Sequence, residues 1–263
     1  MKKPFIHLRC LSSYSLSEST LKIQKLVQIA KKNNMPALAI TDNNNMFGVF
    51  EFAQECSRNK IQPIIGSSIN LLDIEHNDKI SQLSFLVKNE IGYKNLIYLS
   101  SLSYLNKNRD LGISIADIEG HTEGLFCFLG GEFNPLLILN EQNKTNDELI
   151  NKLKNLFYNN LLIELQRIGD SEIDRFENNL VQISNEFNIP LIGTNNVKFG
   201  ESDDFSAHDA LLCIAQKTTI NTGDRKTSNN QLSFKNHKEM FEIFKDVPEI
   251  TENNYNVAIS CSY

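Results

Sequence analysis

Short apolar runs that end in clusters of polar residues recur along this chain of 263 residues. Residues 37–40, Ala-Leu-Ala-Ile, are too few for a helix and follow Pro36, so they predict a buried parallel strand. The run ends in Thr41, Asp42 and three asparagines, and α/β proteins present such polar groups at the carboxyl edge of the sheet. Similar runs predict strands at residues 5–11, 61–66 with a continuation to 74, 82–87, 125–129, 160–165 and 190–193.

Between these strands lie segments in which apolar residues recur every three or four positions, which is typical of amphipathic helices. In the segment at residues 47–56, we expect Phe47, Phe50 and Phe52 to point into the core. The other predicted helices cover residues 21–32, 92–105, 146–157, 176–187, 206–214, 238–244 and 249–260.

The alternation of strands and helices implies an α/β fold with a parallel sheet and right-handed crossovers. At this length a closed barrel is favoured over an open doubly wound sheet, because no glycine-rich phosphate loop follows the first strand. No repeat or linker interrupts the pattern, so residues 1–263 are predicted to form a single domain. Since the sequence stops just after a helical stretch, without a tail, we expect it to be part of a longer chain.

Composition narrows the class of protein. The net charge of −6 and the pI near 5.5 argue against broad non-specific binding of nucleic acid by this chain. Its five cysteines are widely spaced and form no C-x-x-C pair, and no signal peptide precedes them, so they predict reduced thiols in a cytoplasmic protein. No apolar run approaches the length of about 18 residues that a membrane span needs, so no membrane contact is expected.

The ends of the predicted strands supply the candidate site. A hydrolytic metal site on a barrel needs histidine and carboxylate ligands that converge from several strands. The strand ends of this chain hold one carboxylate and one imidazole beside two cations and many neutral amides, and Arg and Lys repel a metal cation. We therefore expect a polar pocket without a metal, built from His7, Arg9, Asp42, Asn43, Asn45, Ser68, Gln82, Gln166, Asn195, Asn196 and Lys198.

Individual residues of this set have structural as well as functional interpretations. Arg9 and Asp42 are expected to form an internal ion pair, with Asp42 otherwise anchoring a loop or acting as a surviving catalytic acid. Lys198 is interpreted as a partner of Asp42 or a solvated side chain, with a phosphate or DNA contact as the alternative.

The histidines and asparagines are interpreted in the same way. His7 is expected to be a hydrogen-bonded barrel histidine rather than a lone ligand, and His208 to cap or pack within its own helix. Asn195 and Asn196 are expected to satisfy loop backbone groups, with a ligand role as the alternative. We expect three further histidines to lie on the surface, namely His76, His121 and His237.

Several longer motifs occur in order along the whole chain. They are His7-Leu8-Arg9 with Ser12-Ser13-Tyr14-Ser15, Met35 to Asp42 with Asn45-Met46-Phe47-Gly48, Gln62-Pro63-Ile64-Ile65-Gly66, Gly92-Tyr93-Lys94-Asn95-Leu96, Glu164-Leu165-Gln166-Arg167, Ile189-Pro190-Leu191-Ile192 with Thr194-Asn195, Ser202-Asp203-Asp204 with Ala207-His208, and Glu239-Met240 with Phe244 and Val247-Pro248-Glu249. Together they resemble the PHP (polymerase and histidinol phosphatase) domain that begins the alpha subunit of bacterial DNA polymerase III. The resemblance implies a distorted (β/α)7 TIM-like barrel.

The metal ligands of that family are nearly all replaced here. The resemblance places the His-x-His pair on Arg9 and Leu11, the Asp-His pair on Asp42 and Asn43, a Glu on Ser68, a His on Gln82, another His on Ile168, and the Asp-x-His on Asn196 and Lys198. Asp42 alone keeps the family's residue type. The resemblance thus implies a degenerate, pseudoenzyme domain with no catalytic residue, no metal and no cofactor, whose vestigial pocket consists of His7, Arg9, Asp42, Asn43, Ser68, Gln82, Asn196 and Lys198.

In such relatives the domain is a structural platform. The resemblance implies that it packs on the polymerase palm and thumb of the same chain, docks the proofreading exonuclease subunit, and meets DNA only through the parent polymerase. The parent would be a DNA-directed DNA polymerase, a nucleotidyltransferase that uses Mg²⁺ through residues outside this chain. The alternatives are a residual metal-dependent phosphoesterase or pyrophosphatase, which needs more ligands than Asp42, and a free-standing small-molecule-binding barrel.

Overall fold

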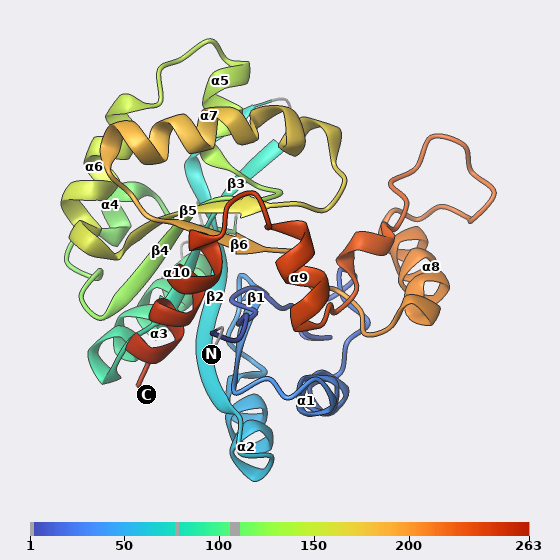
Figure 1. Cartoon of the computed structure of the whole chain (residues 1–263). Coiled ribbons are helices and arrows are strands. Elements are labelled where there is room, and N and C mark those ends of the chain that lie inside the picture. Colours follow the sequence, from blue (N-terminus) through green and yellow to red (C-terminus); the bar gives the residue numbers. More distant parts are fainter. Residues whose placement is uncertain (1–2, 77–78, 106–110, 263) are drawn as a thin grey trace.

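The computed structural model describes residues 3–76, 79–105 and 111–262, with the side chains of residues 75 and 76 left aside (Figure 1). The strands are β1 Ala37–Asn43, β2 Gln62–His76, β3 Lys79–Val87, β4 Leu125–Gly130, β5 Leu161–Gln166 and β6 Leu191–Thr194. The helices are α1 Ile23–Lys32, α2 Val49–Arg58, α3 Glu90–Leu105, α4 Ile115–Ile118, α5 Pro135–Glu141, α6 Asp147–Phe157, α7 Ser171–Phe187, α8 Phe205–Ala215, α9 His237–Ile243 and α10 Glu249–Ser260. Short 3-10 turns lie at η1 Tyr158–Asn160, η2 Ser202–Asp204 and η3 Asn230–Leu232.

The six strands form one curled sheet in the order of the sequence, and the N-terminal segment closes it. On one side, the amides of Ala39 and Thr41 in β1 donate to the carbonyl oxygens of His7 and Cys10, at 3.0 and 2.8 Å. On the other side, the Leu11 amide donates to the carbonyl oxygen of Val197, at 2.9 Å. The chain therefore forms the expected distorted (β/α)7 TIM-like barrel. The segment at residues 5–11 takes the place of the seventh strand, but it forms a single bridge, from Cys10 to Val197, instead of a regular strand.

The prediction of an all-parallel sheet is wrong at β3. This strand runs antiparallel to both β2 and β4, whereas β1–β2, β4–β5 and β5–β6 are parallel pairs. The physical reason is the length of the connection between β2 and β3. Parallel neighbours need a crossover of a dozen or more residues, and the few residues between the two strands can only join antiparallel neighbours.

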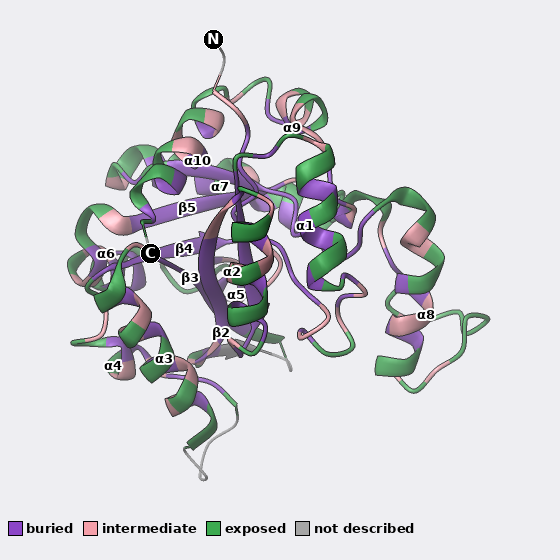
Figure 2. Ribbon diagram, turned by 90° about the horizontal axis from the view of Figure 1, so that it is seen from below, coloured by how far each residue is buried: buried purple, intermediate pink, exposed green. Residues whose placement is uncertain are grey.

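The interior of the barrel has an apolar end. Alternate residues of the strands point inward and pack against the inner face of α10, which covers this end. We call this cluster the floor; it consists of Ile6, Leu8, Ala37, Ala39, Ile64, Leu86, Phe126, Phe128, Leu162 and Ile192 with Val257 and Ala258 of α10 and Cys261 just after it. Figure 2 shows the strands buried, with helices around them that bury their inner faces and expose their outer ones.

The outer face of the sheet packs against the helices in a second, larger core. In α2, Val49, Phe52 and Cys56 form the buried stripe, spaced three and four residues apart. Phe50 lies beside this stripe and Phe47 precedes the helix, so these two rings are 74% and 66% exposed and their prediction as core residues is wrong. Within the described residues, no helix has the length and apolar character needed to cross a membrane.

Candidate functional site

Above the floor, towards the carboxyl edge of β1, β2, β5 and β6, the barrel interior is polar. The Arg9 guanidinium donates through Nη1 to Glu164 Oε2 at 2.8 Å and to Ser84 Oγ at 2.7 Å, and both members of this ion pair are almost fully buried. Thr194 Oγ1 donates to the other oxygen of Glu164 at 2.6 Å. We call this set the polar layer; it consists of Arg9, Ser68, Ser84, Glu164, Gln166 and Thr194.

Strand alternation and two glycines place Glu164 in the layer. Leu162 on β5 belongs to the floor, so Glu164, two residues later, points to the same interior. Across the barrel wall, a Cβ at Gly130 would lie 2.0 Å from the Glu164 carbonyl oxygen, and a Cβ at Gly131 would lie 2.8 Å from its carboxylate. Both glycines have positive φ, so larger residues would be strained as well as crowded.

Asp42 does not pair with Arg9, and that prediction is wrong. Its Oδ1 accepts from the Ser12 amide and the Ser15 hydroxyl, both at 2.6 Å, and its Oδ2 accepts from the Ser12 hydroxyl at 2.7 Å. Burial raises the pKa of Asp42, while the hydrogen bonds from Ser15 and Ser12 oppose that rise. Asp42 follows the inward-facing position of Thr41, so it points out of the interior, where it anchors the loop at residues 12–15.

A second charged cluster lies in the loops beyond β4 and β6. Lys198 Nζ donates to Glu132 Oε2 at 2.7 Å, Lys226 Nζ donates to Oε1 at 2.5 Å, and Asn196 Nδ2 donates to Oε2 at 3.2 Å. Burial alone would raise the pKa of Glu132, but the two ammonium groups hold it well below its usual value. The partner of Lys198 is therefore Glu132, and the prediction of Asp42 as its partner is wrong.

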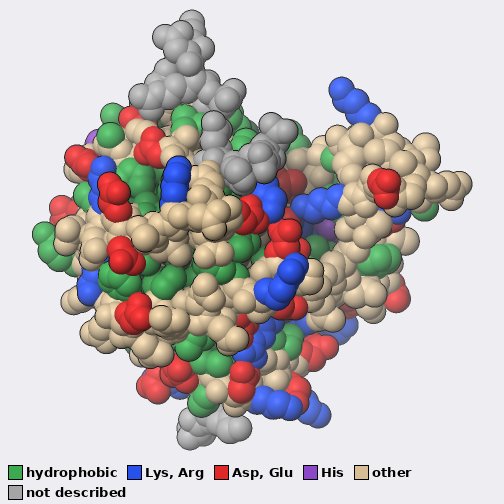
Figure 3. Space-filling model, turned by 90° about the horizontal axis from the view of Figure 1, so that it is seen from above, with side chains coloured by type: hydrophobic (Ala, Val, Ile, Leu, Met, Phe, Trp, Pro, Cys, Tyr) green, Lys and Arg blue, Asp and Glu red, His purple; other side chains and the backbone are tan. Residues whose placement is uncertain are grey.

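A cavity of about 560 Å³ opens beside this cluster, against α8 and the loop that follows it. Arg225 in its wall is held by both carboxylate oxygens of Asp209, at 2.8 and 2.7 Å. Figure 1 shows α8 and the loop after it projecting from the barrel, and Figure 3 shows acidic and basic side chains interspersed on this face. The cations of this wall are thus already neutralised by carboxylates of the chain.

His208 stabilises the same region through contacts outside its own helix, contrary to expectation. Its Nδ1 and the Ser228 hydroxyl are 2.6 Å apart, and its Nε2 donates to the Glu18 carbonyl oxygen at 2.9 Å. Burial lowers the pKa of this ring, so the neutral form is favoured. The histidine ties α8 to the loop at residues 12–18.

The remaining predicted residues have separate partners. Asn43 Nδ2 donates to Glu18 Oε2 at 2.6 Å, and Gln82 Nε2 donates to Asn70 Oδ1 at 2.9 Å. His7 contacts the Lys235 carbonyl oxygen through Nε2 at 2.8 Å, which confirms it as a hydrogen-bonded barrel histidine.

The asparagines after β6 and the three remaining histidines contact different kinds of group. Asn195 donates to the carbonyl oxygens of Gln231 and Ser233, which confirms its role in satisfying loop backbone. Asn196 instead donates to a carboxylate. The ring of His121 stacks on Tyr98, and His237 accepts from the Phe5 amide. Both histidines are half-buried, so they lie at the surface as expected but are partly covered by these contacts. The side chain of His76 lies outside the described residues.

The eight residues predicted as one pocket thus belong to different sets. Arg9 and Ser68 lie in the polar layer, whereas Asn196 and Lys198 meet at Glu132. The predicted set lacked the two carboxylates that organise these groups, Glu164 and Glu132. For Glu164 a signal was available, because a charged residue within the buried run at residues 160–165 requires a buried partner.

The residues at this edge do not fit a divalent metal. Among the described residues, no group of three or more His, Cys, Asp or Glu side chains is arranged to hold a metal ion. Arg9 and Lys198 bring positive charge to the edge, and each occupies a carboxylate oxygen that would otherwise attract a cation. The arrangement is that of internal ion pairs.

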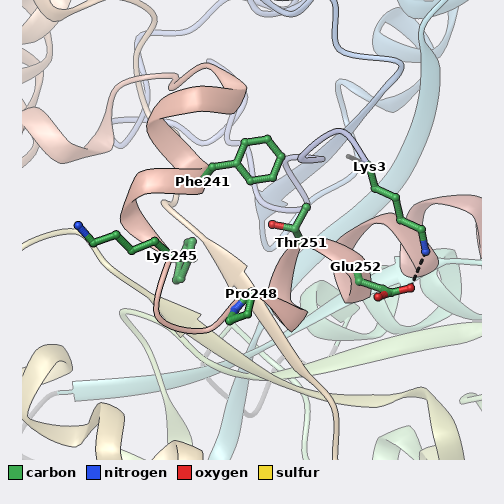
Figure 4. A pocket seen from close by; sticks show the side chains of 7 residues that line it. Lys3, Phe241, Lys245, Pro248, Thr251 and Glu252 are labelled. Atoms are coloured by element: carbon green, nitrogen blue, oxygen red, sulfur yellow. Dashed lines mark hydrogen bonds and ion pairs between the residues drawn. The ribbon is translucent and has the colours of Figure 1, made fainter. Parts of the chain in front are cut away.

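A second hollow, of about 420 Å³, lies between α9 and α10, away from the polar layer (Figure 4). Phe241, Pro248 and Thr251 line it, and Glu252 in its wall pairs with Lys3 at 2.7 Å. Its one carboxylate is thus already paired, and the residues that line it provide no second acid for general acid–base chemistry.

Comparison with known proteins gives a family and several relatives. Residues 7–168 match the family model of the PHP domain. The chain is 35% identical over 269 residues to the DNA polymerase III subunit alpha of Rickettsia bellii (strain RML369-C), covering 100% of this chain and 23% of that protein. It is 34% identical over 273 residues to the subunit of the same name from Borreliella burgdorferi, covering 98% and 24%. The chain thus spans about a quarter of the length of these relatives.

Two solved structures are similar at low identity. One is an amidohydrolase from Chromobacterium violaceum, with a TM-score of 0.45 and 12% identity, covering 73% of this chain and 87% of that one. The other is a two-domain protein from Bacteroides vulgatus containing a predicted PHP-like metal-dependent phosphoesterase, with a TM-score of 0.47 and 13% identity, covering 75% and 52%.

Proposed function

The chain belongs to the PHP-domain family, and from that premise we propose that it is the non-catalytic PHP domain of a DNA polymerase III alpha subunit. In this role it is a structural platform for the polymerase domains of the same chain and a docking surface for the proofreading exonuclease subunit. Metal-dependent nucleotide transfer, with its Mg²⁺, would belong to residues outside this chain, and DNA would be bound through those residues.

One observation carries the proposal of a non-catalytic domain. At the edge where the family's ligands would converge, Arg9 is paired with the buried Glu164 and Lys198 with Glu132. A metal cation cannot displace the Arg9 guanidinium or the Lys198 ammonium group from its carboxylate without leaving a buried charge unpaired, which is strongly unfavourable. The carboxyl edge of the barrel is thus stabilised by the chain's own charges.

The second candidate, a metal-dependent phosphoesterase or pyrophosphatase, has less support. Asp42 is the only residue of the ligand set that keeps its type, and both of its oxygens are engaged by Ser12 and Ser15. A free-standing small-molecule-binding barrel would need an open interior, whereas the floor and the polar layer fill this one. The buried, free thiols support the expected cytoplasmic location.

Metal analysis tests the loss of catalysis. We expect purified protein, incubated with Mn²⁺ or Zn²⁺ and desalted, to retain far less than one metal ion per chain and to hydrolyse no p-nitrophenyl phosphate above a buffer blank. A metal-binding PHP phosphoesterase treated in parallel serves as the positive control. Stoichiometric metal together with phosphatase activity would overturn the proposal in favour of the second candidate.

Docking of the exonuclease subunit needs a separate experiment. We expect immobilised chain to retain its own exonuclease subunit at micromolar concentrations, while an unrelated barrel of similar charge retains none. If the subunit flows through unretained, the docking role is wrong and the intramolecular scaffold alone remains.

A further inference from the structure

The outer surface of α3 is unusually apolar. Five of its large side chains are between 42% and 71% exposed, namely Ile91, Ile97, Tyr98, Tyr104 and Leu105. Residues 95–105 contain no charged side chain, although a surface helix normally presents charges to solvent. The helix buries Leu96 and Leu99 on its inner side, and its exposed charges are confined to the Glu90–Lys94 ion pair at its start. Exposed apolar side chains gathered in this way mark a surface that another segment covers.

These side chains form two lines along the helix. Ile91, Tyr98 and Leu105 follow one another at intervals of seven residues, and so do Ile97 and Tyr104. Positions seven apart lie nearly above one another on a helix, so each set forms a line parallel to the axis. We call these five residues the α3 strip; from residue 91 to residue 105 it is about 21 Å long.

The α3 strip continues onto α2. The rings of Tyr104 and Phe47 lie 6.5 Å apart between centroids, and Phe50 is exposed on the first turn of α2. The two phenylalanines that were expected in the core therefore extend the strip at the carboxyl edge of the barrel. Exposed apolar side chains thus lead from the last turn of α3 to the start of α2.

The C-terminal end of the described chain lies at the other end of the α3 strip. The Ser262 amide donates to the Lys88 carbonyl oxygen at 2.9 Å, two residues before α3 begins. Figure 1 shows the C-terminus beside α3. A segment that followed Ser262 would begin beside the start of α3, where Ile91 opens the strip.

We propose that the α3 strip binds the segment that directly follows Tyr263 in a longer chain, and that this segment runs along α3 towards Phe47 and Phe50. This inference rests on the proposed function, because it needs a chain that continues as in the relatives, of which this chain covers 23% and 24%. The platform role then has a structural basis: the strip fixes the direction in which the polymerase domains leave the barrel.

Thiol labelling of the full-length protein tests the burial of the strip. The five cysteines of this chain are buried, and peptide mass spectrometry assigns the maleimide to the introduced thiol. We expect the Ile97→Cys thiol to react at least about tenfold more slowly than a matched control, Asn179→Cys, on the exposed face of α7. Equal rates for the two thiols would overturn the inference.

Photo-crosslinking identifies what covers the strip. With p-benzoylphenylalanine in place of Tyr104, we expect the crosslinked peptide to come from the residues that follow Tyr263 in the same molecule. A crosslink to a second copy, to the exonuclease subunit or to a remote segment would overturn the inference. The intact mass of the natural protein separates the two proposals: a chain ending at Tyr263 would refute the polymerase-domain role, whereas a longer chain with a reactive Ile97→Cys refutes only the binding to the α3 strip.

Discussion

The floor and the polar layer are two ends of one barrel interior, and they are stabilised in different ways. The same strands build both, since β5 gives Leu162 to the floor and Glu164 to the layer. In the floor each side chain needs only apolar neighbours of the right volume. In the layer each group needs a particular partner, as Arg9 needs Glu164. The floor therefore tolerates substitutions that keep its volume, whereas the polar layer depends on all of its members together.

The largest expected effect tests the floor. Phe128 is fully buried, and Phe128→Ala should lower the free energy of unfolding by roughly 3–5 kcal/mol, because it leaves a cavity that the barrel wall cannot close. Urea denaturation followed by circular dichroism measures the loss. Phe128→Leu keeps most of the volume and should lose less than half as much; an equal loss in both variants would contradict the role of volume.

The next effect tests the layer. Glu164→Gln leaves the Arg9 guanidinium buried without its carboxylate and should lower the free energy of unfolding by about 3 kcal/mol. The double variant Arg9→Met/Glu164→Gln removes the unpaired charge and should regain at least half of that loss in the same urea experiment. Strictly additive losses for the two substitutions would show that the residues do not act as a pair.

A third test concerns His7, a polar group that lies beside Phe5 and Phe234 and lacks the carboxylate partner that Arg9 has. Burial lowers the pKa of His7 from 6.5 to about 4, so between these values the unfolded chain binds a proton that the folded chain does not. Its contribution to stability is complete above pH 6.5 and is lost as the pH falls towards 4.

We therefore expect the native protein to lose about 2 kcal/mol more than His7→Gln between pH 7 and pH 5, as measured by urea denaturation at each pH. The variant is the control for the native protein, because the two proteins share every other titrating group. Parallel stability curves for the two proteins would rule out a buried neutral histidine.

The smallest effect separates burial from charge pairing. Lys152 and Glu119 form a surface pair at 3.4 Å, with both side chains about half exposed. Lys152→Ala should change the free energy of unfolding by less than about 0.5 kcal/mol, since solvent screens the pair. Thermal unfolding is sensitive enough to check this, and a loss comparable to that of Glu164→Gln would mean that charge pairing alone, without burial, explains the polar layer.

Local pattern and the resemblance predicted most of the strands and the barrel. The apolar runs at residues 37–40, 82–87 and 125–129 lie within β1, β3 and β4, because buried strands of a barrel are short and continuously apolar. The pattern did not indicate the direction of β3, since an apolar run has the same composition in either orientation. It also overestimated the regularity of residues 5–11, where a single bridge replaces a ladder.

The sequence alone did not indicate which side chains pair with one another in the candidate site. Arg9 and Glu164 are 155 residues apart in the sequence, and Lys198 and Glu132 are 66 residues apart. Which side chains meet inside a barrel depends on strand register and on the face each residue presents, and the adjacent positions Thr41 and Asp42 face opposite ways. Sequence reasoning found the cations at the edge and missed the carboxylates that neutralise them.

The closing of the barrel by its first residues bears on how the protein is made. The Leu11 amide meets the carbonyl oxygen of Val197, so a ribosome that adds about 5–20 residues per second needs roughly 10–40 s to supply this closing partner. During that time the edge of the segment at residues 5–11 that faces away from β1 is unpaired, and Arg9 lacks Glu164 until 155 further residues have been made. The nascent barrel is then an open sheet with an unpaired edge, a form prone to aggregation. We expect it to need chaperone protection until the residues after β6 pair with the N-terminal segment.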